Sequence, residues 1–183
     1  RTHRRILQQA ADRFGVQPQY LVAFWGLETN FGSNLGKIPT LNSLSTLACD
    51  ERRSEFFTTE FLEALRLLER GHIEHGAMIG SWAGAMGHTQ FMPSTYMRHA
   101  LDGDSDGRID LWRSVPDAML SAANFLNSLG WQRNVRWGRE VKLPKQFDYS
   151  LAGMDRPRKL EHWRDDGITH ANGKRLPASD TEA

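Results

Sequence analysis

Glycine and proline constrain the fold of this chain more than any other feature, because they divide its first 130 residues into short segments. Between these breaks, apolar residues recur at helical spacing. Gly15 and Gly71 end two segments, and Pro18 fits the first turn of another. We therefore predict a mainly α fold (α+β with minor strands), with a loop over 30–39 and helices over residues 3–14, 20–29, 41–49, 54–70, 93–100 and 116–129.

Two regions depart from this helical pattern. The segment from Gly80 to Gly87 holds too many glycines for a surface helix, which predicts a close approach of two backbones. Residues 131–160 carry eight Lys or Arg against three Asp or Glu and have no helical period. A run of this kind is more often a solvated basic surface than a binding site. We predict a helical domain over residues 1–130 and a basic, irregular, truncated subdomain over 131–183, with a short strand at 141–143.

Charge and cysteine content exclude several classes of protein. The chain has 183 residues and 23 basic against 22 acidic side chains, which excludes a nucleic-acid binder held by overall charge. Its one cysteine, Cys49, rules out an internal disulfide framework and is interpreted as a small buried residue. No run approaches the ~20 apolar residues that span a bilayer. Because the chain opens on Arg1 rather than Met, we expect the full protein to extend beyond it, with any membrane anchor outside this sequence.

Glu28 is the first candidate for chemistry. Leu21, Phe24 and Trp25 lie seven, four and three positions before it, so all four share one helical face. A carboxyl on an apolar face has a raised pKa when it is partly desolvated, which suits a general acid. From position alone, a structural glutamate paired with an arginine remains the more common outcome. The glycine-containing loop that follows Glu28 favours an open cleft beside the helix end.

An acidic loop over residues 102–110, DGDSDGRID, resembles an EF-hand. Carboxylates alternate at Asp102, Asp104 and Asp106, Gly107 permits a sharp bend, and Asp110 stands at the ninth position. In this pattern Arg108 offers its backbone carbonyl. The twelfth position holds Arg113 instead of a bidentate Glu, and Asp117 can replace it only in a longer loop, over residues 102–117. The alternative is a turn without an ion, held by Asp side chains.

Gln90 is the third candidate, because its amide can both donate and accept hydrogen bonds with a sugar. Phe91 and Met92 beside it fit either a hydrophobic core or a sugar-stacking surface. There is no P-loop, Rossmann or Gly-x-Ser-x-Gly motif, which disfavours nucleotide-binding enzymes and serine hydrolases.

Several ordered motifs together resemble the B-type lytic murein transglycosylases, a family of periplasmic bacterial enzymes with a lysozyme-like helical domain. The matching segments keep the order and approximate spacing of that family from about residue 5 to residue 135. They are GLETNFG at 26–32, LNSLSTL at 41–47, Arg52–Arg53 followed by EFF at 55–57, GSWAGAMG at 80–87, QFMPS at 90–94, DGRIDLW at 106–112 and ANF at 123–125.

The resemblance implies a reaction and the residue that carries it. These enzymes cleave the β-1,4 bond between N-acetylmuramic acid and N-acetylglucosamine without net hydrolysis. Glu28 would be the sole acid and then base, first protonating the glycosidic oxygen and then taking the proton of the C6 hydroxyl, which closes a 1,6-anhydro ring. Intramolecular attack would replace a bound water.

The resemblance also implies binding residues and a structural ion. Ser81 and Gln90 would line the cleft, and Arg52 and Arg53 would contact the stem peptide of the glycan strand. Phe125 occupies a cleft position where the family pattern has Tyr. The acidic loop would hold a structural Ca²⁺ through Asp102, Asp104, Asp106, Arg108, Asp110 and Asp117. The resemblance implies no cofactor for the chemistry.

Location and competing functions complete these expectations. The resemblance implies a monomer in the Gram-negative periplasm, associated with the outer membrane through a segment outside this chain. A muramidase that uses water is the alternative enzyme, and a glycan-binding or calcium-dependent structural module is the alternative from another class. The retained Glu28 favours catalysis.

Overall fold

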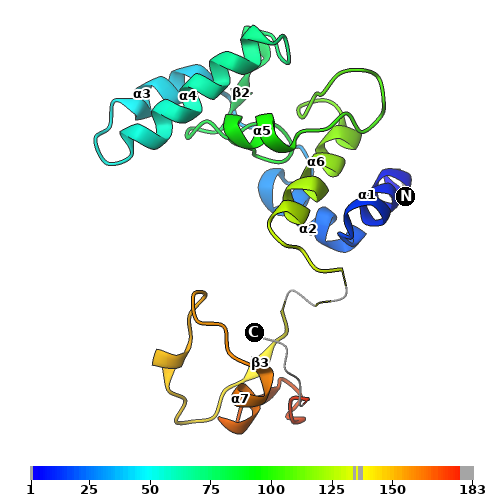
Figure 1. The fold of residues 1–183 in the computed structure, drawn as a ribbon, viewed down its shortest axis with the longest axis vertical. Helices are drawn as coiled ribbons and strands as arrows, with labels where there is room; N and C mark the ends of the chain where they lie inside the picture. Colours follow the sequence, from blue (N-terminus) through cyan, green and yellow to red (C-terminus); the bar gives the residue numbers. More distant parts are fainter. Residues whose placement is uncertain (1, 134, 136–137, 178–183) are drawn as a thin grey trace. The chain divides into compact units, whose positions relative to one another are not determined.

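The computed structural model describes residues 2–133, 135 and 138–177. The chain divides into two compact units, residues 1–133 and residues 134–183. Figure 1 shows the first unit in blue to green, and it contains most of the helices. The assignment of catalysis to this unit remains a prediction.

The described part of the first unit contains six α-helices and one short two-stranded antiparallel sheet. The helices confirm the predicted ones to within one residue at each end, except that Pro18 and Gln19 lengthen the second helix. The mainly α class is confirmed with them. Residues 38–39, predicted as loop, form a strand antiparallel to 79–80. None of the described helices is long and apolar enough to cross a membrane. The elements are α1 (Arg4–Phe14), α2 (Pro18–Thr29), β1 (Ile38–Pro39), α3 (Thr40–Ala48), α4 (Ser54–Glu69), η1 (His75–Ala77), β2 (Ile79–Gly80), α5 (Pro93–His99) and α6 (Val115–Ser128).

A continuous core lies around α6, which packs against α1, α2 and α5, while α3 packs against α4 (Figure 1). Met119 and Leu120 of α6 are almost fully buried, as is Phe91, whose core interpretation is confirmed. Cys49 is exposed, so the expectation of a buried cysteine was wrong; it directly follows the last residue of α3.

A buried carboxylate joins α4 to α5. Glu60, which is 4% exposed, accepts hydrogen bonds from the backbone N–H (2.9 Å) and the hydroxyl (2.7 Å) of Ser94 in the first turn of α5. It therefore serves as a helix cap supplied from another helix.

The second unit has a small core of its own. Its elements are β3 (Val141–Lys142), η2 (Tyr149–Leu151), α7 (Leu160–Asp165) and β4 (Thr169–His170), with β3 antiparallel to β4. Leu160, Ile168 and Leu176 form its buried cluster. The strand expected at 141–143 is confirmed at 141–142, whereas the expectation of irregular structure was wrong for α7. Six residues are too few to display a helical period.

Candidate active site

Glu28 is the penultimate residue of α2. Leu21 on the same face is fully buried, whereas Glu28 itself is exposed at the solvent edge of that face. Neighbouring protein nevertheless surrounds part of its carboxyl group, and this burial raises the pKa of Glu28 above its ordinary value. The C-terminal end of a helix disfavours a negative charge, which acts in the same direction. Among the described residues, no hydrogen bond or ion pair engages the carboxyl group, which leaves it available to a ligand.

Thr29 fastens the loop that follows Glu28. This threonine is 1% exposed, and its hydroxyl donates to the carbonyl oxygen of His88 (3.2 Å) and accepts the N–H of Gly32 (3.0 Å). Gly32 has φ +83°, and a Cβ there would overlap the His88 ring. Only glycine therefore lets the loop lie this close to residues 86–91. We call this arrangement the Thr29 clamp.

Two non-glycine residues within the same loop have left-handed backbone conformations. Asn30 has φ +48° and Phe31 has φ +59°. The Phe31 ring packs back onto Trp25 (centroids 5.6 Å apart) and onto the bare Cα of Gly26, where a Cβ would lie 2.9 Å from the ring. Such conformations are unfavourable by about 1–3 kcal/mol each and occur where surrounding contacts enforce them. The turn thus keeps the chain folded back beside Glu28.

His88 supports this region and was not identified from the sequence. Its Nδ1 accepts the indole N–H of Trp25 at 3.1 Å, and burial lowers its pKa. The neutral ring with its proton on Nε2 satisfies both observations. The two residues are 63 positions apart, so no local pattern signals their contact.

Ser81 lies in the glycine-rich segment, whose predicted close backbone approach is confirmed. A Cβ on Gly36 would overlap the carbonyl of Gly80, and one on Gly80 would overlap that of Ala85. The Ser81 hydroxyl accepts the N–H of Ala85 at 3.0 Å and so closes the turn. Its own O–H remains available as a donor.

Gln90 lies at the tip of the next turn, with φ +49°. Met86 and Phe91 exchange two backbone hydrogen bonds (2.8 and 3.0 Å) on either side of it. The Gln90 amide donates to the carbonyl of Gly87 (3.0 Å), and its amide oxygen has no partner among the described residues. Phe125 packs behind this turn, 5.3 Å from Phe91 between ring centroids. The turn thereby presents one hydrogen-bond acceptor on a rigid support.

Arg52 and Arg53 lie in the turn between α3 and α4. Arg52 forms an exposed ion pair with Asp50 (2.8 Å), and the guanidinium of Arg53 lies 4.5 Å from the centroid of the Phe56 ring. Within the described part of the chain, neither side chain is bonded to Glu28. The structure therefore places these arginines on their own exposed surface.

Three of the predicted metal ligands converge. Oxygens of Asp102, Asp104 and Asp106 lie within 4.8 Å of one another. Asp102 also accepts the backbone N–H groups of Gly107 (2.8 Å) and Ser105 (2.6 Å), and these hydrogen bonds lower its pKa. Convergent carboxylate oxygens in a tight turn fit a hard cation such as Ca²⁺.

Asp117 closes the acidic loop from the inside. It is 1% exposed, and its two oxygens accept the N–H groups of Gly103 and Asp110, each at 2.7 Å. Burial raises its pKa, and these hydrogen bonds oppose that rise. The carboxyl of Asp110 accepts the N–H of Trp112 (2.9 Å). In the described residues, Asp110 and Asp117 lie outside the convergent group of three carboxylates.

Comparisons with known proteins agree on one family. A family model described as "Transglycosylase SLT domain" matches residues 1–183. The chain is 42% identical over 157 residues to membrane-bound lytic murein transglycosylase B of Escherichia coli, which covers 81% of this chain and 43% of that protein.

Solved structures give the same result. SltB3 from Pseudomonas aeruginosa, in complex with NAG-anhNAM-pentapeptide, superposes with a TM-score of 0.90 at 44% identity. The match covers 99% of this chain and 48% of the SltB3 chain. An Escherichia coli lytic transglycosylase in complex with calcium gives 0.83 at 28% identity, covering 97% and 57%. The chain thus spans about half the length of the relatives that it matches.

Proposed function

This chain belongs to the family of transglycosylase SLT domains, and on that premise we propose that it is a peptidoglycan lytic transglycosylase. The reaction would cleave the β-1,4 bond between N-acetylmuramic acid and N-acetylglucosamine and leave a 1,6-anhydromuramoyl end. The observation that carries this proposal is Glu28: a carboxyl with a raised pKa, open to solvent, beside a loop held in a strained conformation.

Glu28 serves twice in this mechanism. Its protonated form gives a proton to the glycosidic oxygen as the C1–O bond breaks, and the muramoyl N-acetyl carbonyl stabilises the positive charge at C1. The Glu28 carboxylate then takes the proton of the C6 hydroxyl, and that oxygen bonds to C1. The pKa of Glu28 is raised by burial and not by a neighbouring negative charge. The absence of a second carboxylate among these causes supports a site with one catalytic carboxylate.

The remaining cleft residues position the substrate. The free amide oxygen of Gln90 accepts a hydrogen bond from a sugar hydroxyl, and the Ser81 hydroxyl donates one. Phe125 supports the Gln90 turn without contributing a hydroxyl. Arg52 and Arg53 bind carboxylates of the stem peptide, since guanidinium groups pair with carboxylates in a bidentate manner.

A structural Ca²⁺ is the second part of the proposal. Asp102, Asp104 and Asp106 would hold it, with Asp110, Asp117 and the Arg108 carbonyl as further ligands. The ion would supply positive charge that neutralises the loop. No catalytic cofactor is implied for the family.

We place the protein at the peptidoglycan of the Gram-negative periplasm, as a monomer. The name of the Escherichia coli relative, a membrane-bound enzyme, supports membrane association through a segment outside this sequence.

Mass spectrometry of peptidoglycan digests tests this function. Wild-type chain should release products that are one water lighter than hydrolysed muropeptides, and Glu28→Gln should release none. Reducing-end products would instead identify a muramidase. Binding without any cleavage by the wild type would identify a glycan-binding module.

A further inference from the structure

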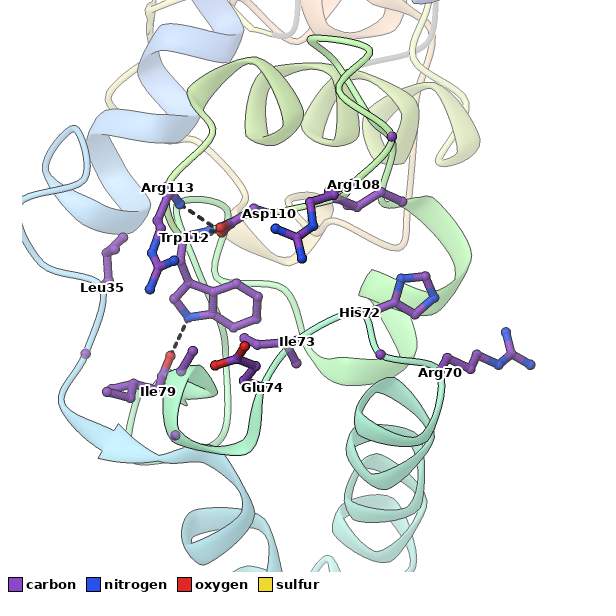
Figure 2. A pocket seen from close by; sticks show the side chains of 16 residues that line it. Leu35, Arg70, His72, Ile73, Glu74, Ile79, Arg108, Asp110, Trp112 and Arg113 are labelled. Atoms are coloured by element: carbon purple, nitrogen blue, oxygen red, sulfur yellow. Dashed lines mark hydrogen bonds between the residues drawn. The ribbon is translucent and has the colours of Figure 1, made fainter.

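A cavity of about 950 Å³, whose lining does not include Glu28, lies between the α4–β2 connection and residues 107–113. Figure 2 shows Arg108, Asp110, Trp112 and Arg113 on one side of it and Glu74 on the other. None of the proposed catalytic or sugar-binding residues lines this cavity. We call it the Trp112 cavity.

Trp112 is held rigidly in this cavity. Its indole N–H donates to the carbonyl of Ile79 at 2.7 Å, and its backbone N–H donates to Asp110 at 2.9 Å. Ile79 in turn pairs with Pro39 in the β1–β2 sheet. Because its polar atom is already bonded, the indole offers only its ring surface to a ligand. Figure 2 shows this ring between the charged side chains.

Four charged side chains that line the cavity, those of Arg70, Arg108, Arg113 and Glu74, have no bonded partner among the described residues. Arg108 and Arg113 use their backbone N–H groups within the acidic loop, but no hydrogen bond or ion pair engages either guanidinium among the described residues. The carboxylate of Glu74 is likewise unpaired there. Asp110, by contrast, already accepts two backbone N–H groups. With Arg70 at the rim, the unpaired charges in the described lining are thus three cations and one anion around an aromatic surface.

We propose that the Trp112 cavity binds a short peptide that carries free carboxylates and one amino group. Guanidinium groups hold carboxylates in bidentate geometry, a carboxylate pairs with an ammonium group, and the indole covers the apolar atoms between them. Peptidoglycan stem peptides combine these groups, so the identity of the peptide rests on the proposed function. The cavity would be a second peptide site, separate from Arg52 and Arg53.

The cavity shares backbone with the candidate active site. Leu35 and Gly36, which line it, belong to the loop that begins after Glu28, and Gly36 lies against Gly80 and Ser81. A peptide bound here would therefore contact Leu35 and Gly36, and Gly36 packs against the glycine-rich segment that carries Ser81. This arrangement would hold a peptide-bearing strand next to the strand being cleaved.

Isothermal titration calorimetry with the stem pentapeptide, its N-terminus blocked so that one amino group remains, tests this site. The probe has no glycosidic bond, so its binding does not depend on catalysis. We expect Arg108→Ala/Arg113→Ala to weaken binding at least tenfold. The matched control is Arg139→Ala/Lys142→Ala, which removes the same charge from exposed positions of the second unit and should leave affinity within twofold.

Chemical variants of the probe make the same test on the unaltered chain, in case the arginine variants are unstable. Amidating the peptide carboxylates should weaken binding at least tenfold. Acetylating the peptide amine should weaken its binding to the wild type. The Glu74→Gln variant should bind the acetylated and the unacetylated peptide with equal affinity, because it lacks the carboxylate that pairs with the amine.

Three results would overturn the proposal. The wild type could fail to bind the peptide at millimolar concentration, or the Arg108→Ala/Arg113→Ala variant could bind it with wild-type affinity. The third is a loss of affinity seen in the Arg52→Ala/Arg53→Ala variant alone. Cleavage of peptide-free glycan by the wild type in a parallel assay would show that such a failure concerns this cavity and leaves the lytic activity standing.

Discussion

The Thr29 clamp provides the sharpest test of how this fold supports catalysis. In Thr29→Val, a methyl group replaces the hydroxyl at nearly constant volume. The N–H of Gly32 and the carbonyl of His88 then lose their partner. A buried polar group left without a partner destabilises a protein by about 1–3 kcal/mol. His88 is buried and Gly32 half-buried, so we expect a loss of about 2–3 kcal/mol in the free energy of unfolding.

This loss should lower the melting temperature by about 6–9 °C, since a domain of this size shifts by about 3 °C per kcal/mol. Thermal melts followed by circular dichroism measure it. Turnover should fall at least tenfold at temperatures well below the melt, because the loop beside Glu28 is no longer fixed and small displacements of a catalytic group are expensive.

Thr59→Val is the matched control. Thr59 makes one exposed hydrogen bond from its hydroxyl to the carbonyl of Glu55 (2.9 Å) on α4. It should change the melting temperature by less than 2 °C and leave turnover unaltered, as exposed substitutions do. Equal effects of the two substitutions on stability and turnover would refute the reasoning about the clamp.

Four further predictions follow from the site. Glu28→Gln should reduce turnover by about 10²–10⁴-fold. It should not lower the melting temperature, because burial disfavours the charged carboxylate that the substitution removes. Turnover within threefold of wild type would contradict the assignment. In the pH profile of kcat/KM, activity should fall as pH rises through the raised pKa of Glu28, because the acid must be protonated. A fall in activity centred below the ordinary value of 4.5 would exclude Glu28 as the acid. Calcium should raise the melting temperature more than magnesium does. At a hundredfold excess over its Kd, bound calcium should stabilise the folded state by about 2.7 kcal/mol. Asp104→Ala should abolish that rise in melting temperature and leave turnover unchanged. Arg52→Ala/Arg53→Ala should slow cleavage of peptide-bearing glycan more than of peptide-free glycan, and equal losses would indicate a structural role.

The helices were predictable because their signals are local. Gly15 and Gly130 end α1 and α6 in left-handed conformations, as glycine does after a helix, and the apolar periods between such breaks are complete. By contrast, β1 and β2 are two residues each and pair across 40 positions, so neither has a period to detect.

Glu28 and Glu60 show the limit of the helical-face argument for the site. Glu60 follows Phe57 by three positions and precedes Ala64 by four, so it shares a face with apolar residues just as Glu28 does. The structure separates them: Glu60 is buried and bonded to Ser94, whereas Glu28 is exposed and unpartnered among the described residues. The sequence pattern identifies carboxyl groups near apolar surface, but only a distant partner distinguishes a helix cap from a candidate acid.

The Thr29 clamp also bears on when a newly made chain could acquire activity. Thr29 and His88 are 59 positions apart, and closing a segment of that length is entropically unfavourable until other contacts hold its ends together. During synthesis, α2 emerges complete long before His88 does, so Glu28 is present early in a nascent chain that has nothing to fix its loop. The geometry proposed for catalysis can arise only after the ribosome has delivered the turn at residues 86–91. A chain interrupted before that point would carry the candidate acid without the contacts that fix its loop.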